Sequence, residues 1–270
     1  MSPGKAAYLF CFARSDLLPS QLEIEGLEPG SRLLQHSRGD LVAVLSEVSL
    51  EDFTGPRAEA QLQDLGWLAP RALRHEQVTE EAARHSPVFP ARFGTIFSSL
   101  DLVEALLVRH HDVIRAFLDR TLDAEEWGVK GYLDRNQAQE RLVEEELTKG
   151  GAAALSASPG MRYMQERKLR AQADTKVSGW LGETSTRLKD VLARRALELA
   201  ERRLLPAGAG ESPGEMVLNW SFLVPRPGVK AFLAEVEQQG GGLAERGLVL
   251  HAAGPFPPFS FTPGLDEPEP

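Results

Sequence analysis

The sequence predicts an α+β protein with two domains, each combining helices with a small, largely antiparallel, ferredoxin-like sheet. Three observations predict this class. The chain has 270 residues, which is more than a single domain usually holds. Short apolar runs bounded by Gly, Pro and Asp are typical of strands, and they alternate with stretches of helical periodicity. From 125 to 254 the expected order is strand, helices, strand, helix, strand, which favours α+β over a doubly wound sheet.

The first domain is expected to span residues 1–122. A buried strand is predicted over 6–14, and a hairpin over 31–48, where a short polar stretch from Ser37 to Asp40 separates two apolar runs. One helix is expected over 70–85, with Pro70 at its first position. A longer helix, capped by Ser98 or Ser99, is expected to run to Leu122. The prolines of 86–90 predict an extended edge segment between these two helices.

The second domain is expected to span residues 123–270. Strands are predicted over 125–134, 216–224 and 247–261, and helices over 135–148 and 227–239. Gly128 and Gly131 indicate a bulge or close packing in the first of these strands. Loops are expected at 149–160 and 205–215, and the acidic end, 265–270, is expected to fray.

A long helix is expected near residues 161–205, where no proline interrupts the pattern. Aliphatic residues form one stripe there at intervals of three, four or seven residues. Such a stripe serves either as core within the protein or as a docking face for a partner, and the core interpretation is favoured. The stripe begins at Val177, and its leucines, which form a candidate partner surface, are Leu181, Leu188, Leu192 and Leu199.

Composition argues against several classes of protein. The net charge of -9 does not suit a nucleic-acid binder. No apolar run approaches the roughly 20 residues of a membrane-spanning helix. The first residues lack the pattern of a signal peptide, so a cytoplasmic protein is expected. The only cysteine, Cys11, excludes an internal disulfide, and its apolar neighbours indicate a buried side chain rather than a nucleophile.

The residues predict no catalytic, metal or cofactor site. His110 and His111 are adjacent and therefore face different sides of a helix, and no HExxH or CxxC motif accompanies the six histidines. The glycine-rich stretch at 238–247 lies between a helix and a strand, which is the reverse of the order in a phosphate-binding loop. No GxSxG motif is present to anchor a catalytic serine.

One charge stands in the apolar stretch "SPVFPARFGTIF" (86–97). Arg92 is expected either to clamp a phosphate or carboxylate or, as the favoured interpretation, to pair with an internal carboxylate. Glu126 is the candidate partner, because a buried charge among phenylalanines must be paired. Glu125 and Glu126 are also a possible acid–base pair, although a structural role is favoured.

Three blocks, in this order, resemble the gas vesicle protein F/L family (GvpF/GvpL). They are "PVFPARFGTIF" (87–97), "EWGVKGYLD" (126–134) and "GPFPPFSF" (254–261), and "MVLNWSFLVPR" (216–226) also fits. The resemblance covers nearly the whole chain. It departs from the family's pattern at Ala91, Phe256 and Phe259, where relatives often have a larger aliphatic, Trp and Tyr. The structural or interaction motif that it implies comprises Pro87, Pro90, Arg92, Phe93, Gly94, Glu126, Trp127, Gly128, Lys130, Gly254, Pro255, Phe256, Pro257, Pro258 and Phe259.

The resemblance implies an accessory or structural protein of gas vesicle assembly that is not an enzyme and needs no cofactor. Its implied partners are the major hydrophobic shell protein and other accessory proteins, in the cytoplasm or at the gas vesicle. The proline-aromatic tail is one candidate contact, because a rigid Pro-Pro segment loses little entropy on docking. Alternatively, the tail folds back and seals the domain junction.

Two other classes of function stay open from the sequence. One is a small-ligand-binding regulatory module, which needs a closed polar pocket near Arg92. The other is a hydrolase that uses Glu125 or Glu126, which needs a deep cleft around them.

Overall fold

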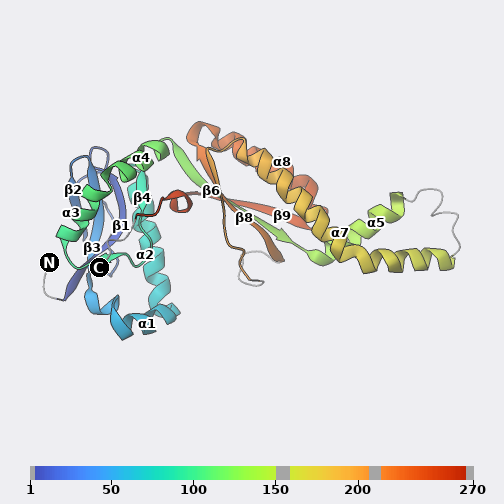
Figure 1. The fold of residues 1–270 in the computed structure, drawn as a ribbon, viewed down its shortest axis with the longest axis horizontal. Helices are drawn as coiled ribbons and strands as arrows, with labels where there is room; N and C mark the ends of the chain where they lie inside the picture. Colours follow the sequence, from blue (N-terminus) through green and yellow to red (C-terminus); the bar gives the residue numbers. More distant parts are fainter. Residues whose placement is uncertain (1–3, 150–158, 207–213, 266–270) are drawn as a thin grey trace. The chain divides into compact units, whose positions relative to one another are not determined.

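The computed structural model describes residues 4–149, 159–206 and 214–265 and has the predicted α+β fold. The chain forms two compact units (Figure 1). Unit 1 comprises Met1–Glu126 with Pro255–Pro270, and unit 2 comprises Trp127–Gly254. The tail, expected in the second domain, therefore packs with the first unit. The segments 150–158, 207–213 and 266–270, which hold most of the expected loops and the acidic end, lie outside the described residues.

Unit 1 is built on a five-stranded sheet of order β2-β3-β1-β4, in which β5 also pairs with β1. Its strands are β1 (Lys5–Arg14), β2 (Leu33–Arg38), β3 (Leu41–Ser49), β4 (Val88–Pro90) and β5 (Ile96–Phe97). The expected hairpin forms between β2 and β3, and its turn contains Gly39 at a φ of 61°. The expected extended segment becomes β4, at the edge of the sheet. A bulge at Phe10 shifts the register of β1 against β3.

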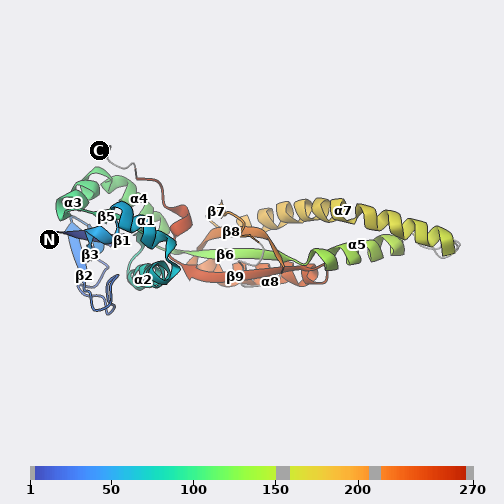
Figure 2. The same ribbon diagram turned by 90° about the horizontal axis from the view of Figure 1, so that it is seen from below.

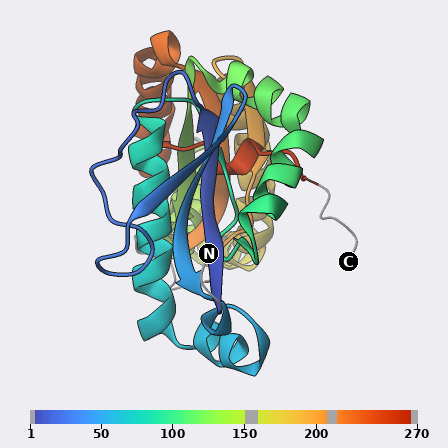
Figure 3. The same cartoon turned by 90° about the vertical axis from the view of Figure 1, so that its left-hand side faces the viewer.

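Helices cover both faces of this sheet (Figure 3). They are α1 (Gly55–Gln63), α2 (Leu65–Ala83), α3 (Leu100–Arg109) and α4 (His111–Thr121). On the side of α2, Val78 and Ala82 join a buried cluster with Tyr8 and Phe10. On the side of α4, the ring of Phe89 lies 4.9 Å from that of Phe117. Every residue of β1 from Ala6 to Ala13 is buried. Because both faces of this strand are covered, its sequence is apolar throughout instead of alternating between apolar and polar residues.

Two helix boundaries in unit 1 differ from the predictions. Helix α2 begins at Leu65, not at Pro70, because the Asp64 carboxylate accepts a hydrogen bond from the Gly66 N–H and caps the helix earlier. The single helix expected after Ser99 is broken into α3 and α4. His110, with φ -110° and ψ 15°, ends the first of these and precedes the second. Ser99 caps α3 as expected, through the Leu102 N–H.

Unit 2 repeats the strand order of unit 1, and the strands of unit 2 are labelled in Figure 2. Its strands are β6 (Ala124–Leu133), β7 (Glu198–Glu201), β8 (Glu215–Pro225) and β9 (Leu248–Phe256), in the order β7-β8-β6-β9. Helices α5 (Arg135–Lys149) and α7 (Pro159–Ala193) connect β6 to β7, and α8 (Val229–Ala244) connects β8 to β9. This is the predicted ferredoxin-like sequence of elements.

The long helix is shorter than expected. Helix α7 ends at Ala193, and Leu199 lies on β7, where it pairs with Phe222 of β8. Pairing with β8 overrides the helical propensity of this stretch. Leu188 and Leu192 are fully buried in the core of unit 2, and Leu181 and Leu199 pack against it. These leucines, the candidate partner surface, thus contribute to the core of unit 2, which is the interpretation that the sequence favoured.

Gly131 provides a test of the packing in unit 2. A Cβ at this position would lie 2.8 Å from Cδ1 and 3.0 Å from Cβ of Leu218. We expect Gly131→Ala to lower the free energy of unfolding by about 1–3 kcal/mol through overpacking. The control is Gly182→Ala on α7, where a Cβ meets open space, so that variant should gain about 0.5–1 kcal/mol. Urea denaturation of both variants tests this, and a G131A protein as stable as G182A contradicts it.

Candidate functional site

The stretch "SPVFPARFGTIF" (86–97), called the Arg92 motif from here on, contains a tight turn between β4 and β5. The Arg92 carbonyl accepts hydrogen bonds from the Thr95 N–H (3.2 Å) and the Thr95 hydroxyl (2.7 Å). Gly94 adopts a φ of 85°, a backbone conformation that residues other than glycine rarely adopt. On either side of the turn, the Ala91 N–H donates to the Phe10 carbonyl, and the Leu9 N–H donates to the Thr95 carbonyl. The turn therefore lies opposite the bulge in β1.

Arg92 itself is exposed and does not pair with Glu126. Within the described part of the chain, its guanidinium makes no ion pair, and both oxygens of Glu126 accept hydrogen bonds from Ser260 instead. The expected pairing is not formed because the turn leaves the Arg92 side chain in solvent. A hydrated guanidinium needs no buried partner.

A histidine that the sequence analysis left unassigned lies beneath this turn. The Gly94 N–H donates to the Tyr8 hydroxyl (3.2 Å), and this hydroxyl lies 2.9 Å from Nδ1 of His75. Nε2 of His75 lies 3.1 Å from the Ala91 carbonyl, which can only accept. Nε2 therefore carries the proton, and Nδ1 accepts from Tyr8. Every polar atom of the ring has a partner in its neutral form.

Burial keeps His75 neutral. The residue is 3% exposed, and this desolvation lowers its pKa to about 4. Burial likewise raises the pKa of Tyr8 far above its usual range. A helical spacing signals the position of His75 in the sequence, because Val78 and Ala82, three and seven residues later, share its buried face. The hydrogen bonds to Tyr8 and Ala91 have no such local signal.

Aromatic rings surround the His75 imidazole. Phe10 stacks on it at 5.7 Å between centroids, Phe93 meets it edge-on at 6.0 Å, and Phe259 lies at 6.1 Å. Phe259 comes from the C-terminal tail. The His75 cluster, defined as Tyr8, His75, Phe93, Gly94 and Phe259, thus joins residues of the Arg92 motif and of the tail within unit 1.

The tail is held to unit 1 by a buried carboxylate. Glu126 is 5% exposed, and its two oxygens accept from the N–H (2.9 Å) and the hydroxyl (2.5 Å) of Ser260. Arg120 donates to the Phe261 carbonyl at 3.2 Å. Phe261 is buried, as are Pro257 and Pro258, whereas Phe256 is 41% exposed. The tail therefore folds back, and most of its apolar surface is already covered.

The remaining motif residues are not part of the His75 cluster. Pro90 is buried on β4 opposite Cys11, and Pro87 precedes that strand. The motif residues Trp127, Gly128 and Lys130 are half-buried on β6, and Gly254 and Pro255 lie on β9. Cys11 is fully buried, and burial raises the pKa of its thiol. This agrees with its interpretation as a small apolar residue.

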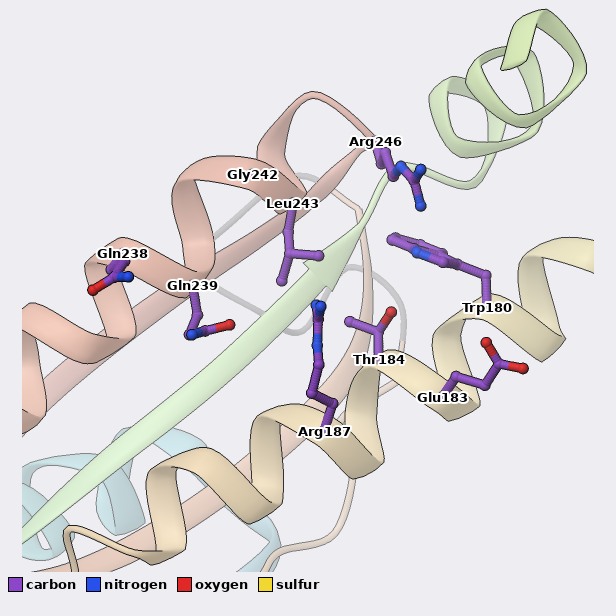
Figure 4. A pocket seen from close by; sticks show the side chains of 9 residues that line it. All are labelled: Trp180, Glu183, Thr184, Arg187, Gln238, Gln239, Gly242, Leu243 and Arg246. Atoms are coloured by element: carbon purple, nitrogen blue, oxygen red, sulfur yellow. The ribbon is translucent and has the colours of Figure 1, made fainter. Parts of the chain in front are cut away.

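An open groove in unit 2 lies between α7 and α8 (Figure 4). It has a volume of about 640 Å³, and Arg187 projects into it from α7. The guanidinium of Arg246 lies 5.8 Å from the ring of Trp180 and binds Glu145. Arg92 is not among the residues that line this groove.

Within the described ranges no three His, Cys, Asp or Glu residues are placed to hold a metal ion. None of the helices there is long and apolar enough to cross a bilayer.

The fold places this chain in a known class of structures. The crystal structure of gas vesicle protein GvpF from Anabaena sp. PCC7120 matches with a TM-score of 0.69 and 18% identity, covering 98% of this chain and 99% of that one. GvpF from Microcystis aeruginosa matches with a TM-score of 0.64 and 16% identity, over 96% and 99% of the two chains. The family described as gas vesicle synthesis protein GvpL/GvpF matches residues 6–263, and the chain belongs to this family.

Relatives in sequence agree with this assignment. Gas vesicle protein L of Streptomyces sp. (strain CB03234) is 32% identical over 265 residues, which cover 97% of this chain and 94% of that protein. Gas vesicle protein F of the same strain is 27% identical over 190 residues, covering 70% and 76%. The resemblance read from the three sequence blocks is thereby confirmed. This is a family of gas vesicle proteins and not a known family of enzymes.

His75 should make stability depend on pH. Its pKa is about 4 in the folded protein and about 6.5 in an unfolded chain, so the unfolded state binds an extra proton between these values. The stabilisation is complete above pH 6.5 and is lost as the pH falls towards 4. Over this range the free energy of unfolding should fall by about 3 kcal/mol more in the wild type than in His75→Gln. Urea midpoints at several pH values test this, and parallel curves for the two proteins contradict it.

The Glu126–Ser260 contact should outweigh a neutral hydrogen bond in the same tail. We expect Ser260→Ala to lower the free energy of unfolding by about 1.5–3 kcal/mol, because a buried carboxylate loses a donor. Thr262→Ala is the matched control, since its hydroxyl donates to the Phe259 carbonyl, and should cost about 0.5–1.5 kcal/mol. Limited proteolysis of the tail provides a second measurement. Equal effects of the two variants would refute the special role of Glu126.

Proposed function

We propose that this protein is a cytoplasmic accessory protein of gas vesicle assembly that binds the hydrophobic shell protein and other accessory proteins. The observation that carries the proposal is membership of the GvpL/GvpF family over nearly the whole chain. Shell subunits expose apolar surface before they polymerise, and a soluble partner that covers this surface keeps them from aggregating. The net charge of -9 keeps such a complex in solution.

The tail and the leucines of the sequence stripe, Leu181, Leu188, Leu192 and Leu199, are largely covered, which makes them weaker candidates for the surface that binds the shell protein. The α2 stripe, defined as Leu65, Ala69 and Leu73, is a better candidate. These residues are spaced by four along α2, so they share one face, and Leu65 and Leu73 are 75% and 55% exposed. Leu62, at the end of α1, is 56% exposed and lies three residues before the stripe.

The α2 stripe is suited to this role because the other face of the same helix is fixed. His75, Val78 and Ala82 anchor α2 on the sheet of unit 1, and Arg71 binds Glu28 through two hydrogen bonds of 2.9 and 2.7 Å. An apolar face on a rigid helix binds a partner without an ordering cost. Two exposed leucines and an alanine on one face of a helix fit a contact with an apolar partner.

A charge-insertion experiment tests this proposal. We expect the double variant Leu65→Glu/Leu73→Glu to lose at least tenfold in retention of the shell protein, because two carboxylates must be desolvated at the contact. The measurement is co-purification of tagged protein with the shell protein from a vesicle-forming host.

The matched control replaces two exposed apolar residues of α3, Leu102 and Val108, by glutamate. They are 47% and 56% exposed, and this control should retain the shell protein as the wild type does. Equal loss in both double variants would argue against the α2 stripe. Failure of the wild type to retain shell protein, under conditions that retain other accessory proteins, would argue against the function itself.

A further inference from the structure

The groove between α7 and α8 of unit 2 has no part in the contact proposed above. Its volume of about 640 Å³ is that of an ordinary ligand-binding site. Trp180 and Arg187 both line it from α7, and their separation of seven positions corresponds to a length of about 10 Å. An extended peptide of about three residues has this length. The groove therefore has room for a short segment of another chain.

One buried hydroxyl in the wall of this groove lacks a partner. Thr184 is 4% exposed, and its side chain lines the groove (Figure 4). Thr186, two residues later, donates to the Gly182 carbonyl, as threonines in helices commonly do. The Thr184 hydroxyl makes no hydrogen bond to any residue that the structure describes. Because a buried hydroxyl without a partner is unfavourable, we expect a bound group in the groove to satisfy it.

Arg187 brings an unpaired charge to the same wall. Within the described residues its guanidinium makes no ion pair, whereas Arg135, Arg195 and Arg246 of unit 2 each bind a carboxylate. Glu183 stands one turn earlier, at the spacing of a helical ion pair, yet the Arg187 side chain extends towards α8 instead (Figure 4). A guanidinium in this position matches the two oxygens of a carboxylate.

The opposite wall supplies amides and an open position. Gln239 donates to Glu235 at 2.9 Å, which orients its side chain, and Gln238 is exposed beside it. Side-chain amides both donate and accept, so they suit the backbone of a peptide. Gly242 also lines this wall, and a Cβ there would meet open space. Packing does not require this glycine, and the absence of a side chain keeps the groove open.

The charge of unit 2 permits an acidic ligand. Residues 127–254 contain 18 Lys and Arg residues against 16 Asp and Glu residues, which gives a net charge of +2, although the whole chain carries -9. The excess of negative charge therefore belongs to unit 1. Unit 2 does not repel a negatively charged partner, and the guanidinium of Arg187 attracts one.

We propose that this groove binds an acidic segment of a partner protein, with a carboxylate held by Arg187 and Thr184. These two residues lie three positions apart on α7 and share one face, so a single carboxylate accepts from both. An open groove favours a chain segment over a small molecule, because small molecules are mostly enclosed by their sites. That the partner is another accessory protein of gas vesicle assembly rests on the proposed function, whereas the chemistry of the groove does not.

The experiment titrates the purified full chain with peptides and follows the indole N–H signals of its four tryptophans by NMR. Trp180 lines the groove, and Trp180→Phe identifies its signal. Tetraglutamate, acetylated and amidated at its ends, should shift this signal in a saturable manner, and more weakly at high salt. Tetraglutamine should not shift it. Absence of a saturable shift with tetraglutamate, or equal affinity for the small dicarboxylate glutarate, overturns the proposal.

Two pairs of variants locate the binding. Arg187→Ala should weaken tetraglutamate binding by about tenfold or more, because hydrogen bonds between charged groups are lost. Arg194→Ala removes the same charge just after α7 and outside the groove, so it should bind as the wild type does. Gly242→Gln should block the groove, whereas Gly241→Gln, which also meets open space but lies outside the lining, should not. Equal affinities within either pair contradict the proposal.

Thr184→Val separates a role in binding from a role in folding. The change removes the unpartnered hydroxyl and nearly keeps the shape of the side chain, so the urea midpoint should not fall, while tetraglutamate should bind about threefold more weakly or worse. A lower midpoint with unchanged affinity overturns the role of Thr184. Because these measurements need neither shell protein nor a vesicle-forming host, their failure leaves the proposed function intact, and loss of shell-protein retention leaves this inference intact.

Discussion

The structure of unit 1 depends on one neutral imidazole that is satisfied on both nitrogens. His75 lies on α2, its acceptor nitrogen faces Tyr8 of β1, and its N–H faces the Ala91 carbonyl after β4. A helix, a central strand and the Arg92 turn are thus fixed to the same ring. Because burial disfavours the charged imidazolium and lowers its pKa to about 4, this arrangement favours the neutral ring.

The returning tail uses the same centre. Phe259 packs beside His75, and the next residue along the chain satisfies the buried Glu126. Apolar area from the prolines and phenylalanines supplies most of the burial, and the carboxylate fixes the position of the segment. This packing covers most of the apolar surface of the tail, and for that reason the contact that we propose for a partner is the exposed leucines of α2.

Patterns along the chain were sufficient for the class of fold. Alternating apolar runs, the polar break before β3 and the Ser99 cap are local signals, and the structure has the corresponding elements. The predictions are wrong where a distant partner or a helix cap determines the type of an element or its boundary. Residues 198–201 form a strand only because β8 lies beside them, and Asp64 moves the start of α2 five residues ahead of Pro70.

The candidate site was predictable only in part. The Arg92 turn and the tail carry compositional signals, because glycine and proline restrict the backbone. The Tyr8–His75 contact joins residues 67 positions apart, and nothing in the periodicity of either segment specifies it. The partner of Glu126 was missed for the same reason, since charge sign suggests an arginine and not a serine 134 residues later.

The order in which the chain is made gives the tail a further consequence. Unit 2 is an insertion in unit 1, since residues 127–254 come between Glu126 and the segment that binds it. During synthesis, the carboxylate of Glu126 leaves the ribosome long before Ser260 does, so it stays hydrated until its partner in the tail has been made. Domains generally fold as they emerge from the ribosome. Here the inserted domain, unit 2, can complete its folding before unit 1 does. Completion of unit 1 therefore has to follow the synthesis of unit 2 and of the tail.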